Sequence, residues 1–182
     1  MTPRIVRILR VIGATAMIAG GAAWGITFIR FATEHPGLDS MLWAWPFLAV
    51  GILGGGMLVA MLARWAAVSR GLARAGAALV ATGAAAFSVI LAIPAMVAFL
   101  AGSVVLGAGL SQSPQTRAPG LMIGIATGLF IVTRPWMLGA VQTGDALATQ
   151  EVVEKLLAIS LGVGWALLGI TCLRGNMAKG AG

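Results

Sequence analysis

The feature that most constrains the fold of this chain is a series of apolar stretches, each long enough to cross a lipid bilayer. The hydrocarbon core of a bilayer is about 30 Å thick, which an α-helix crosses in about 20 residues. Residues 11–31, 41–63, 120–141 and 151–173 match this length and carry few charged residues. In hydrocarbon, each backbone N–H and C=O needs a partner within the protein, which a helix provides locally. The sequence therefore predicts an all-α transmembrane helical bundle, polytopic, forming a single domain over residues 1–182.

Composition supports a membrane environment over an aqueous one. The chain is 59% hydrophobic and only 9% charged, whereas soluble domains carry about 25% charged residues. Its net charge of +7 would suggest nucleic-acid binding in a soluble protein, but basic residues such as Arg4, Arg7 and Arg10 lie at the ends of apolar stretches. There they set orientation and meet anionic lipid headgroups. We therefore expect the lipid bilayer as a partner and no nucleic acid.

The first apolar stretch resembles a signal peptide, because three arginines precede it and small residues follow at 20–23. The apolar run nevertheless continues to about Phe31, which is the length of a membrane span. We predict an uncleaved first helix with its basic end in the cytoplasm. The expected location is the bacterial inner (cytoplasmic) membrane, as a multi-pass protein with a cytoplasmic N-terminus.

Residues 75–110 allow two interpretations, because a single helix of this length would extend about 54 Å. In the first, one kinked span over about 78–101 bends at Pro94, which gives five spans in total. In the second, two short spans form a hairpin that turns near Pro94, which gives six.

The positive-inside rule and the chemistry of the turn favour different answers. Leaving aside Arg134, five spans place seven basic residues inside and four outside, whereas six spans place nine inside and two outside. A turn at Pro94, however, would leave unpaired backbone groups in or near lipid. We therefore expect five spans, with six as the alternative. The expected spans are about 11–31, 41–63, 78–101, 120–141 and 151–173.

Two stripes of small residues are the most specific local pattern. Small residues four apart on a membrane helix let the backbone of a neighbouring helix approach closely. Both stripes are candidate helix-packing or partner interfaces, either within the chain's own bundle or against another subunit or a second copy. Their residues are Gly120, Gly124 and Gly128 in one stripe, and Ala158, Gly162 and Ala166 in the other.

Arg134 is the candidate intramembrane polar site, since a charged residue within a span usually faces a partner or water. One hypothesis is a contact with an anion or substrate, or a salt bridge between subunits. The other is that Arg134 marks a helix end and snorkels to the interface beside Trp136. Pro135 breaks the local helical hydrogen bonding in either case.

The inventory of reactive residues argues against an enzyme. The chain has one cysteine, Cys172, and one histidine, His35, which leaves no intramolecular disulfide and little for a zinc site or a catalytic triad. We expect no catalytic, cofactor-binding or metal-binding residues. The predicted function is a non-catalytic integral subunit of a larger inner-membrane complex of the secretion, conjugation or respiratory type. The alternative is a small transporter or channel with a pathway lined near Arg134.

Overall fold

The computed structural model describes most of the backbone and a smaller part of the side chains. The backbone is described for residues 1–34, 44–68, 71–87, 92–140 and 144–177. Side chains are described for residues 1–30, 46–68, 71–87, 94–133 and 152–174. The described segments are helices and connecting turns, with no strand among them. This confirms the predicted all-α class for the part of the chain that is described.

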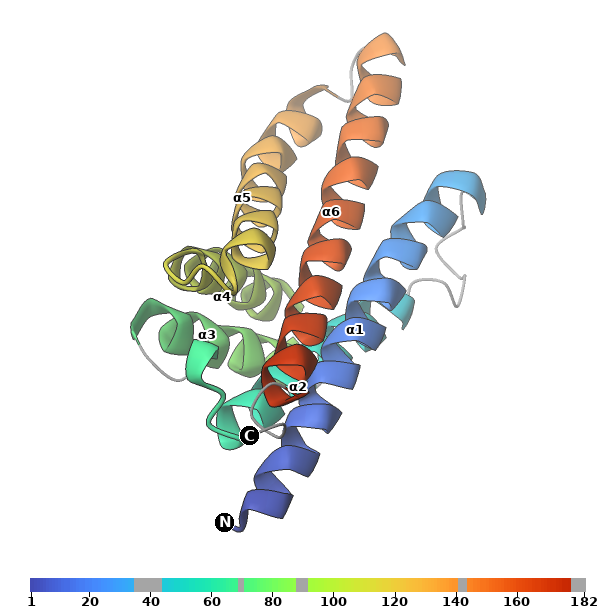
Figure 1. Cartoon of the computed structure of the whole chain (residues 1–182). Coiled ribbons are helices and arrows are strands. Elements are labelled where there is room, and N and C mark those ends of the chain that lie inside the picture. The colour runs from blue at the N-terminus through green and yellow to red at the C-terminus, as the bar shows by residue number, and fades with distance from the viewer. Residues whose placement is uncertain (35–43, 69–70, 88–91, 141–143, 178–182) are drawn as a thin grey trace.

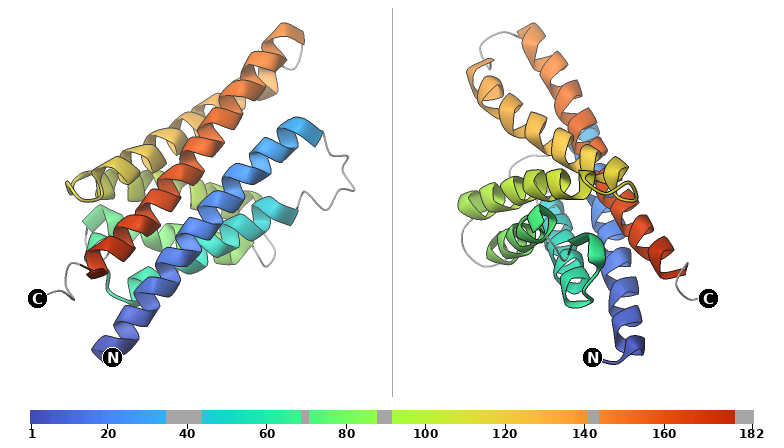
Figure 2. Two further views of the ribbon diagram at one scale, coloured as in Figure 1. Left: turned by 45° about the vertical axis from the view of Figure 1, so that its right-hand side comes forward. Right: turned by 60° about the vertical axis from the view of Figure 1, so that its left-hand side comes forward.

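Six α-helices form the described part of the bundle (Figure 1). They are α1 Pro3–Glu34, α2 Ala44–Leu62, α3 Gly71–Phe87, α4 Ala92–Ser111, α5 Arg117–Ala140 and α6 Gly144–Met177, with a 3-10 turn, η2 Ala66–Val68, before α3. Each helix packs against the next one in sequence, and α6 returns to pack against α1. The helices thus form a closed ring. The start of α1 and the end of α6 lie at the same end of this bundle (Figure 2).

The predicted single helix over residues 78–101 is wrong, because two helices occupy this region. α3 ends at Phe87, α4 begins at Ala92, and the two pack against each other. Pro94 lies in the first turn of α4, where its missing N–H costs no helical hydrogen bond. Pro94 therefore helps to begin a helix and does not bend one. The described residues thus contain the two packed helices that a hairpin in this region requires, and Pro94 lies inside the second of them.

Glycines explain why α3 and α4 pack so closely. Four facing pairs follow each other along the contact: Ala73 with Gly109, Gly76 with Leu106, Val80 with Gly102, and Gly83 with Phe99. Every pair contains one glycine, so the two backbones approach without a side chain between them. A Cβ atom added at Gly83 would lie only 2.5 Å from the backbone nitrogen of Phe99. The close packing of this hairpin therefore requires glycine, whose side chain is a single hydrogen atom, at these positions.

The last helix is longer than predicted. It begins at Gly144 and not at Glu151, so residues 144–150, which precede the expected span 151–173, are helical as well. Along the backbone, Glu151 lies about two turns and Glu154 almost three turns after the start of α6, and Asp145 belongs to its first turn. The other expected spans correspond to described helices: 11–31 lies within α1, 41–63 matches α2, and 120–141 matches α5.

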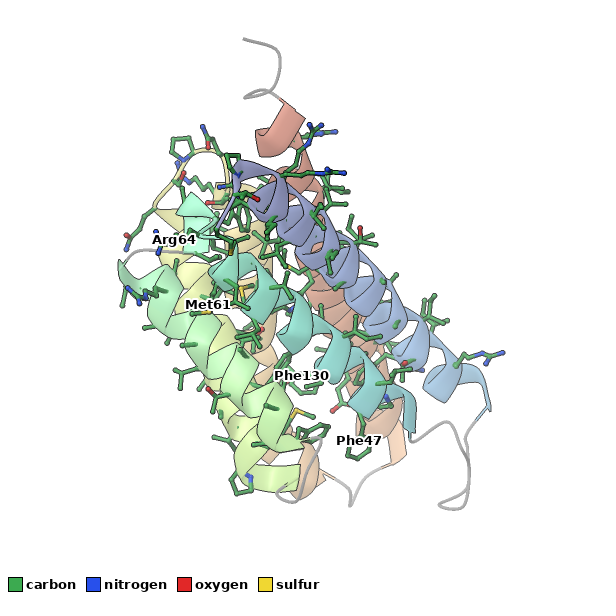
Figure 3. All side chains as sticks on the ribbon, turned by 90° about the horizontal axis from the view of Figure 1, so that it is seen from below. Phe47, Met61, Arg64 and Phe130 are labelled. Atoms are coloured by element: carbon green, nitrogen blue, oxygen red, sulfur yellow. The ribbon has the colours of Figure 1, made fainter. Side chains whose placement is uncertain are left out.

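α2 ends in a Schellman motif that includes Met61 and Arg64, and both residues are labelled in Figure 3. The N–H of Arg64 donates to the carbonyl of Met61 at 2.9 Å, and that of Trp65 donates to Ala60 at 3.1 Å. Arg64 has a φ of 50°, a conformation that usually favours glycine. The motif turns the chain so that Trp65 and Val68 are buried against the bundle.

Apolar helices and an apolar exterior make this a membrane protein. Segments of α1, α4 and α6 are long and apolar enough to cross a bilayer: Pro3–Arg30, Pro94–Ser111 and Val152–Arg174. Shorter apolar segments lie in the other three helices: Pro46–Leu62, Gly71–Phe87 and Arg117–Thr133. Large apolar side chains face outward, with Ile26 57% and Val132 69% exposed. Such a surface is stable against lipid and costly in water.

Candidate functional site

The first predicted stripe lies mainly against α4. A Cβ atom at Gly120 would lie 2.8 Å from the Cβ of Leu110, and one at Gly107 would lie 2.5 Å from the Cα of Gly124. Gly120 and Gly124 therefore bring α5 against the end of α4. Gly107, which the sequence interpretation did not include, is the residue on α4 that makes this approach possible.

The second stripe lies against α1. Gly162 and Gly21 face each other so closely that a Cβ atom on either would meet the backbone carbonyl of the other. Ala158 is only 1% exposed, and the backbone nitrogen of Ala166 would lie 3.0 Å from a Cβ atom at Gly21. This stripe therefore holds α6 and α1 together. Because α1 and α6 are the first and last helices, their contact closes the ring.

Some glycines have open space where a side chain would lie. Among the described residues, no atom lies within 4 Å of a Cβ atom placed at Gly128, the third member of the first stripe. The same holds for Gly55 on α2. Exposed branched side chains lie beside both glycines: Leu58 is 49% exposed on α2, and Ile125 is 56% exposed on α5. These two outward faces combine a small residue with neighbouring ridges, as helix–helix interfaces in membranes do.

Aromatic side chains cross the interior of the ring. The ring centroid of Trp24 on α1 lies 6.4 Å from that of Phe99 on α4, which in turn lies 6.4 Å from that of Trp165 on α6. These three side chains are 2%, 0% and 0% exposed. Phe28 extends the cluster from Trp24 to Phe130 of α5, and Figure 3 labels Phe130. The interior of the ring is thus a packed core built from four helices.

The buried hydroxyl groups in this core are paired within their own helices. Thr27 donates to the carbonyl of Ala23 at 2.7 Å, and Thr127 donates to that of Ile123 at 2.6 Å. Ser103 makes the same bond to the carbonyl four residues before it, at 2.8 Å. The buried indole nitrogens of Trp24 and Trp165, in contrast, have no hydrogen-bond partner among the described residues. A buried, unpaired N–H group carries an energetic cost.

The predicted polar site at Arg134 falls outside the described side chains. The backbone of α5 is helical through Arg134 and Pro135 and ends at Ala140, so Arg134 lies within the helix and not at its end. A pathway lined near Arg134 stays a prediction. Within the described residues, no group of three or more His, Cys, Asp or Glu side chains could hold a metal ion.

No family model, curated protein or solved structure gives a significant match to this chain.

Proposed function

We propose that this chain is a non-catalytic subunit of a larger assembly in the bacterial cytoplasmic membrane, of the secretion, conjugation or respiratory type. The observation that carries the proposal is the pair of outward glycine faces on α2 and α5. Gly55 and Gly128 have open space where a Cβ atom would lie, so the backbone of another helix can approach them.

The packed interior supports the same proposal. The cluster formed by Trp24, Phe99 and Trp165 fills the middle of the ring with apolar surface. The buried hydroxyls of Thr27 and Thr127 are used in bonds to their own helices. The inner faces thus serve the stability of the bundle, and the outer faces are the surfaces that can take a partner.

A glycine-to-isoleucine pair tests the outward faces. In mild detergent, size-exclusion chromatography separates the chain bound to its partners, the larger species, from the monomer. We expect the double variant Gly55→Ile/Gly128→Ile to contain at least tenfold less of the larger species than the wild type. The added side chains fill open space, so they block the approach of another helix and leave the bundle itself intact. Ala78→Ile, at an exposed position on α3, serves as the control and should leave the larger species unchanged. A wild-type chain that purifies only as a lone monomer would contradict the proposal.

We further propose that the chain crosses the membrane six times, with both termini in the cytoplasm. The start of α1 and the end of α6 lie at the same end of the bundle (Figure 1), as an even number of crossings requires. Six crossings put nine basic residues on the inner side and two on the outer, leaving aside Arg134. The five acidic residues are all assigned to the outer side: Glu34, Asp39, Asp145, Glu151 and Glu154. An excess of basic residues on one side of the membrane usually marks the cytoplasmic side.

The turn between α4 and α5 distinguishes six crossings from five. Gln115 is exposed in this turn, which is cytoplasmic with six crossings and external with five. We expect Gln115→Cys, in a Cys172→Ala background, to resist a membrane-impermeant maleimide in intact cells and to react after permeabilisation. The substitution Thr2→Cys at the cytoplasmic N-terminus is the matched control and should behave identically. Labelling of Gln115→Cys in intact cells would contradict six crossings.

A further inference from the structure

The α3–α4 hairpin is shorter than the hydrocarbon core of a typical bilayer, which is about 30 Å thick. α3, Gly71–Phe87, has 17 residues, and a helix of this length extends about 25 Å. The apolar segment Pro94–Ser111 of α4 has 18 residues and extends about 27 Å. The facing pairs that contain glycine hold the two helices side by side. Neither helix therefore reaches across the hydrocarbon core, even when it stands upright in the membrane.

The helices on the opposite side of the ring are long enough to cross a full bilayer. The apolar segments Pro3–Arg30 of α1 and Val152–Arg174 of α6 have 28 and 23 residues, which extend about 42 Å and about 34 Å. α1 packs against α6 and α3 packs against α4, with α2 and α5 between these two pairs. The α3–α4 hairpin is also inclined to α1 and α6 (Figures 1 and 2), which shortens its reach across the membrane further. The bundle thus has a long side and a short side.

An aromatic contact shows where α3 ends relative to α2. Phe87 in the last turn of α3 stacks on Phe47 in the first turn of α2, with ring centroids 4.6 Å apart. The backbone rises about 20 Å from Arg74 to Phe87 and about 22 Å from Phe47 to the end of α2 at Leu62. Arg74 is exposed, and an exposed arginine at the end of an apolar segment extends to the headgroups. The outer end of α3 therefore lies about 5–10 Å short of the far side of a typical hydrocarbon core.

The outer end of the hairpin has no charged residue that could extend to distant headgroups. Residues 75–116 contain no charged residue, whereas the other two outer connections carry acids, Glu34 and Asp39 in one and Asp145 in the other. The last C=O groups of α3 and the first N–H groups of α4 have no partners within their own helices. Hydrocarbon offers them no hydrogen bond. The energy is therefore lower when water and headgroups move inward to the end of the hairpin.

We propose that this chain thins the bilayer beside α3 and α4, and that this side of the bundle fits phospholipids with short acyl chains. A bilayer adapts to a short apolar segment by thinning locally, and a long segment adapts by tilting. Leu79 on α3 is 41% exposed and Val97 on α4 is 59% exposed, so both can contact acyl chains. The inference rests on the six crossings proposed above, which labelling of Gln115→Cys tests separately, and is independent of the role as a subunit.

A matched pair of spin-labelled positions tests the thinning directly. Ala85 lies on α3 at a rise of about 16 Å from Arg74, and Val163 lies on α6 at the same rise from Arg174. Both positions are exposed. The whole chain, carrying Ala85→Cys or Val163→Cys in a Cys172→Ala background, is labelled with a nitroxide and reconstituted in dioleoylphosphatidylcholine. Electron paramagnetic resonance then measures collisions of the label with a water-soluble nickel complex. We expect collisions at Ala85 to be several times more frequent than at Val163, whereas equal frequencies would overturn the thinning.

The preference for short acyl chains is tested by melting the wild type in bilayers of different thickness. In dimyristoleoyl-, dioleoyl- and dierucoylphosphatidylcholine, we expect the melting temperature to be highest in the first and about 5 °C or more lower in the last. A melting temperature that stays constant or rises with chain length would overturn the preference.

A lengthened hairpin is the matched variant for this measurement. Inserting Leu-Ala-Leu-Ala after Phe87 and again before Ala92 adds about 6 Å to each helix outside the glycine contacts. The most stabilising lipid should then be dioleoylphosphatidylcholine. An unchanged optimum in a folded variant would show that another part of the chain sets the preference and would overturn the role of the hairpin. If this variant does not fold, the wild-type melting series and the spin-label pair decide between the outcomes.

Discussion

Replacing Gly83 with alanine is expected to lower the free energy of unfolding by about 1–3 kcal/mol, the usual cost of overpacking a closely packed contact. The new Cβ atom would lie 2.5 Å from the backbone nitrogen of Phe99 and 2.9 Å from the carbonyl oxygen of Ala95. Both atoms belong to the backbone of α4, so no side chain can rotate away and the helices must separate. Unfolding in sodium dodecyl sulfate, followed by circular dichroism, measures the loss.

Gly55→Ala is the matched control for this substitution. It exchanges the same residues inside another helix, but no atom of the described residues lies within 4 Å of the new Cβ atom. Alanine has the higher helix propensity by about 1 kcal/mol, so stability should stay unchanged or rise slightly. Gly83→Leu should go further and prevent the folded protein from accumulating in the membrane. Equal stability of the Gly83→Ala and Gly55→Ala variants would show that the close approach of α3 and α4 is not needed.

Three helices could be predicted from the sequence because clear polar segments bound them. Residues 32–40 and 111–119 carry prolines and polar side chains. The end of α1 and the starts of α2 and α5 lie next to these segments, and each agrees with the expected span to within a few residues. The α3–α4 hairpin could not be found in this way. Residues 88–91 are Ser-Val-Ile-Leu, which give almost no turn signal within a continuous apolar region. Pro94 suggests a turn or a bend in the sequence, but it lies in the first turn of α4.

A different signal for the hairpin was present in the sequence. Gly76 and Gly83 are seven residues apart, as are Gly102 and Gly109. A seven-residue repeat of glycine lines one helix face, and two such repeats in succession indicate a pair of helices in close contact. The positive-inside count also favours six spans, whereas the cost of unpaired backbone groups at a turn in lipid favours five.

The packing stripes could be recognised from the sequence, but their partners could not. A stripe of small residues shows that some backbone comes close, and only the structure identifies Gly107 opposite Gly124 and Gly21 opposite Gly162. The aromatic core is harder still to predict. Trp24, Phe99 and Trp165 come from α1, α4 and α6, and no local spacing connects residues that meet only when the ring closes.

Replacing Trp165 with alanine is expected to lower the free energy of unfolding by about 3–5 kcal/mol, as for other large aromatic side chains removed from a core. Trp165 is 0% exposed and stacks on Phe99. In a membrane protein the loss comes mainly from van der Waals contacts, because lipid already surrounds the unfolded helices with apolar material. The same detergent titration gives the measurement.

Trp165→Phe separates packing from hydrogen bonding at this position. Phenylalanine keeps most of the aromatic contact but removes an indole N–H that has no partner among the described residues. Removing an unpaired polar group is favourable, and this gain offsets part of the energetic cost of the lost side-chain volume. We expect a loss of about 1 kcal/mol or less for this variant, within the range of conservative core substitutions. Phe47→Ala provides the aromatic control outside the core, since Phe47 lies near the start of α2 and is 44% exposed. It should cost clearly less than Trp165→Ala. An equal loss of stability in Trp165→Phe and Trp165→Ala would contradict this expectation. It would mean that the indole N–H of Trp165 donates a hydrogen bond to a bound molecule, so that apolar packing alone does not hold the core together.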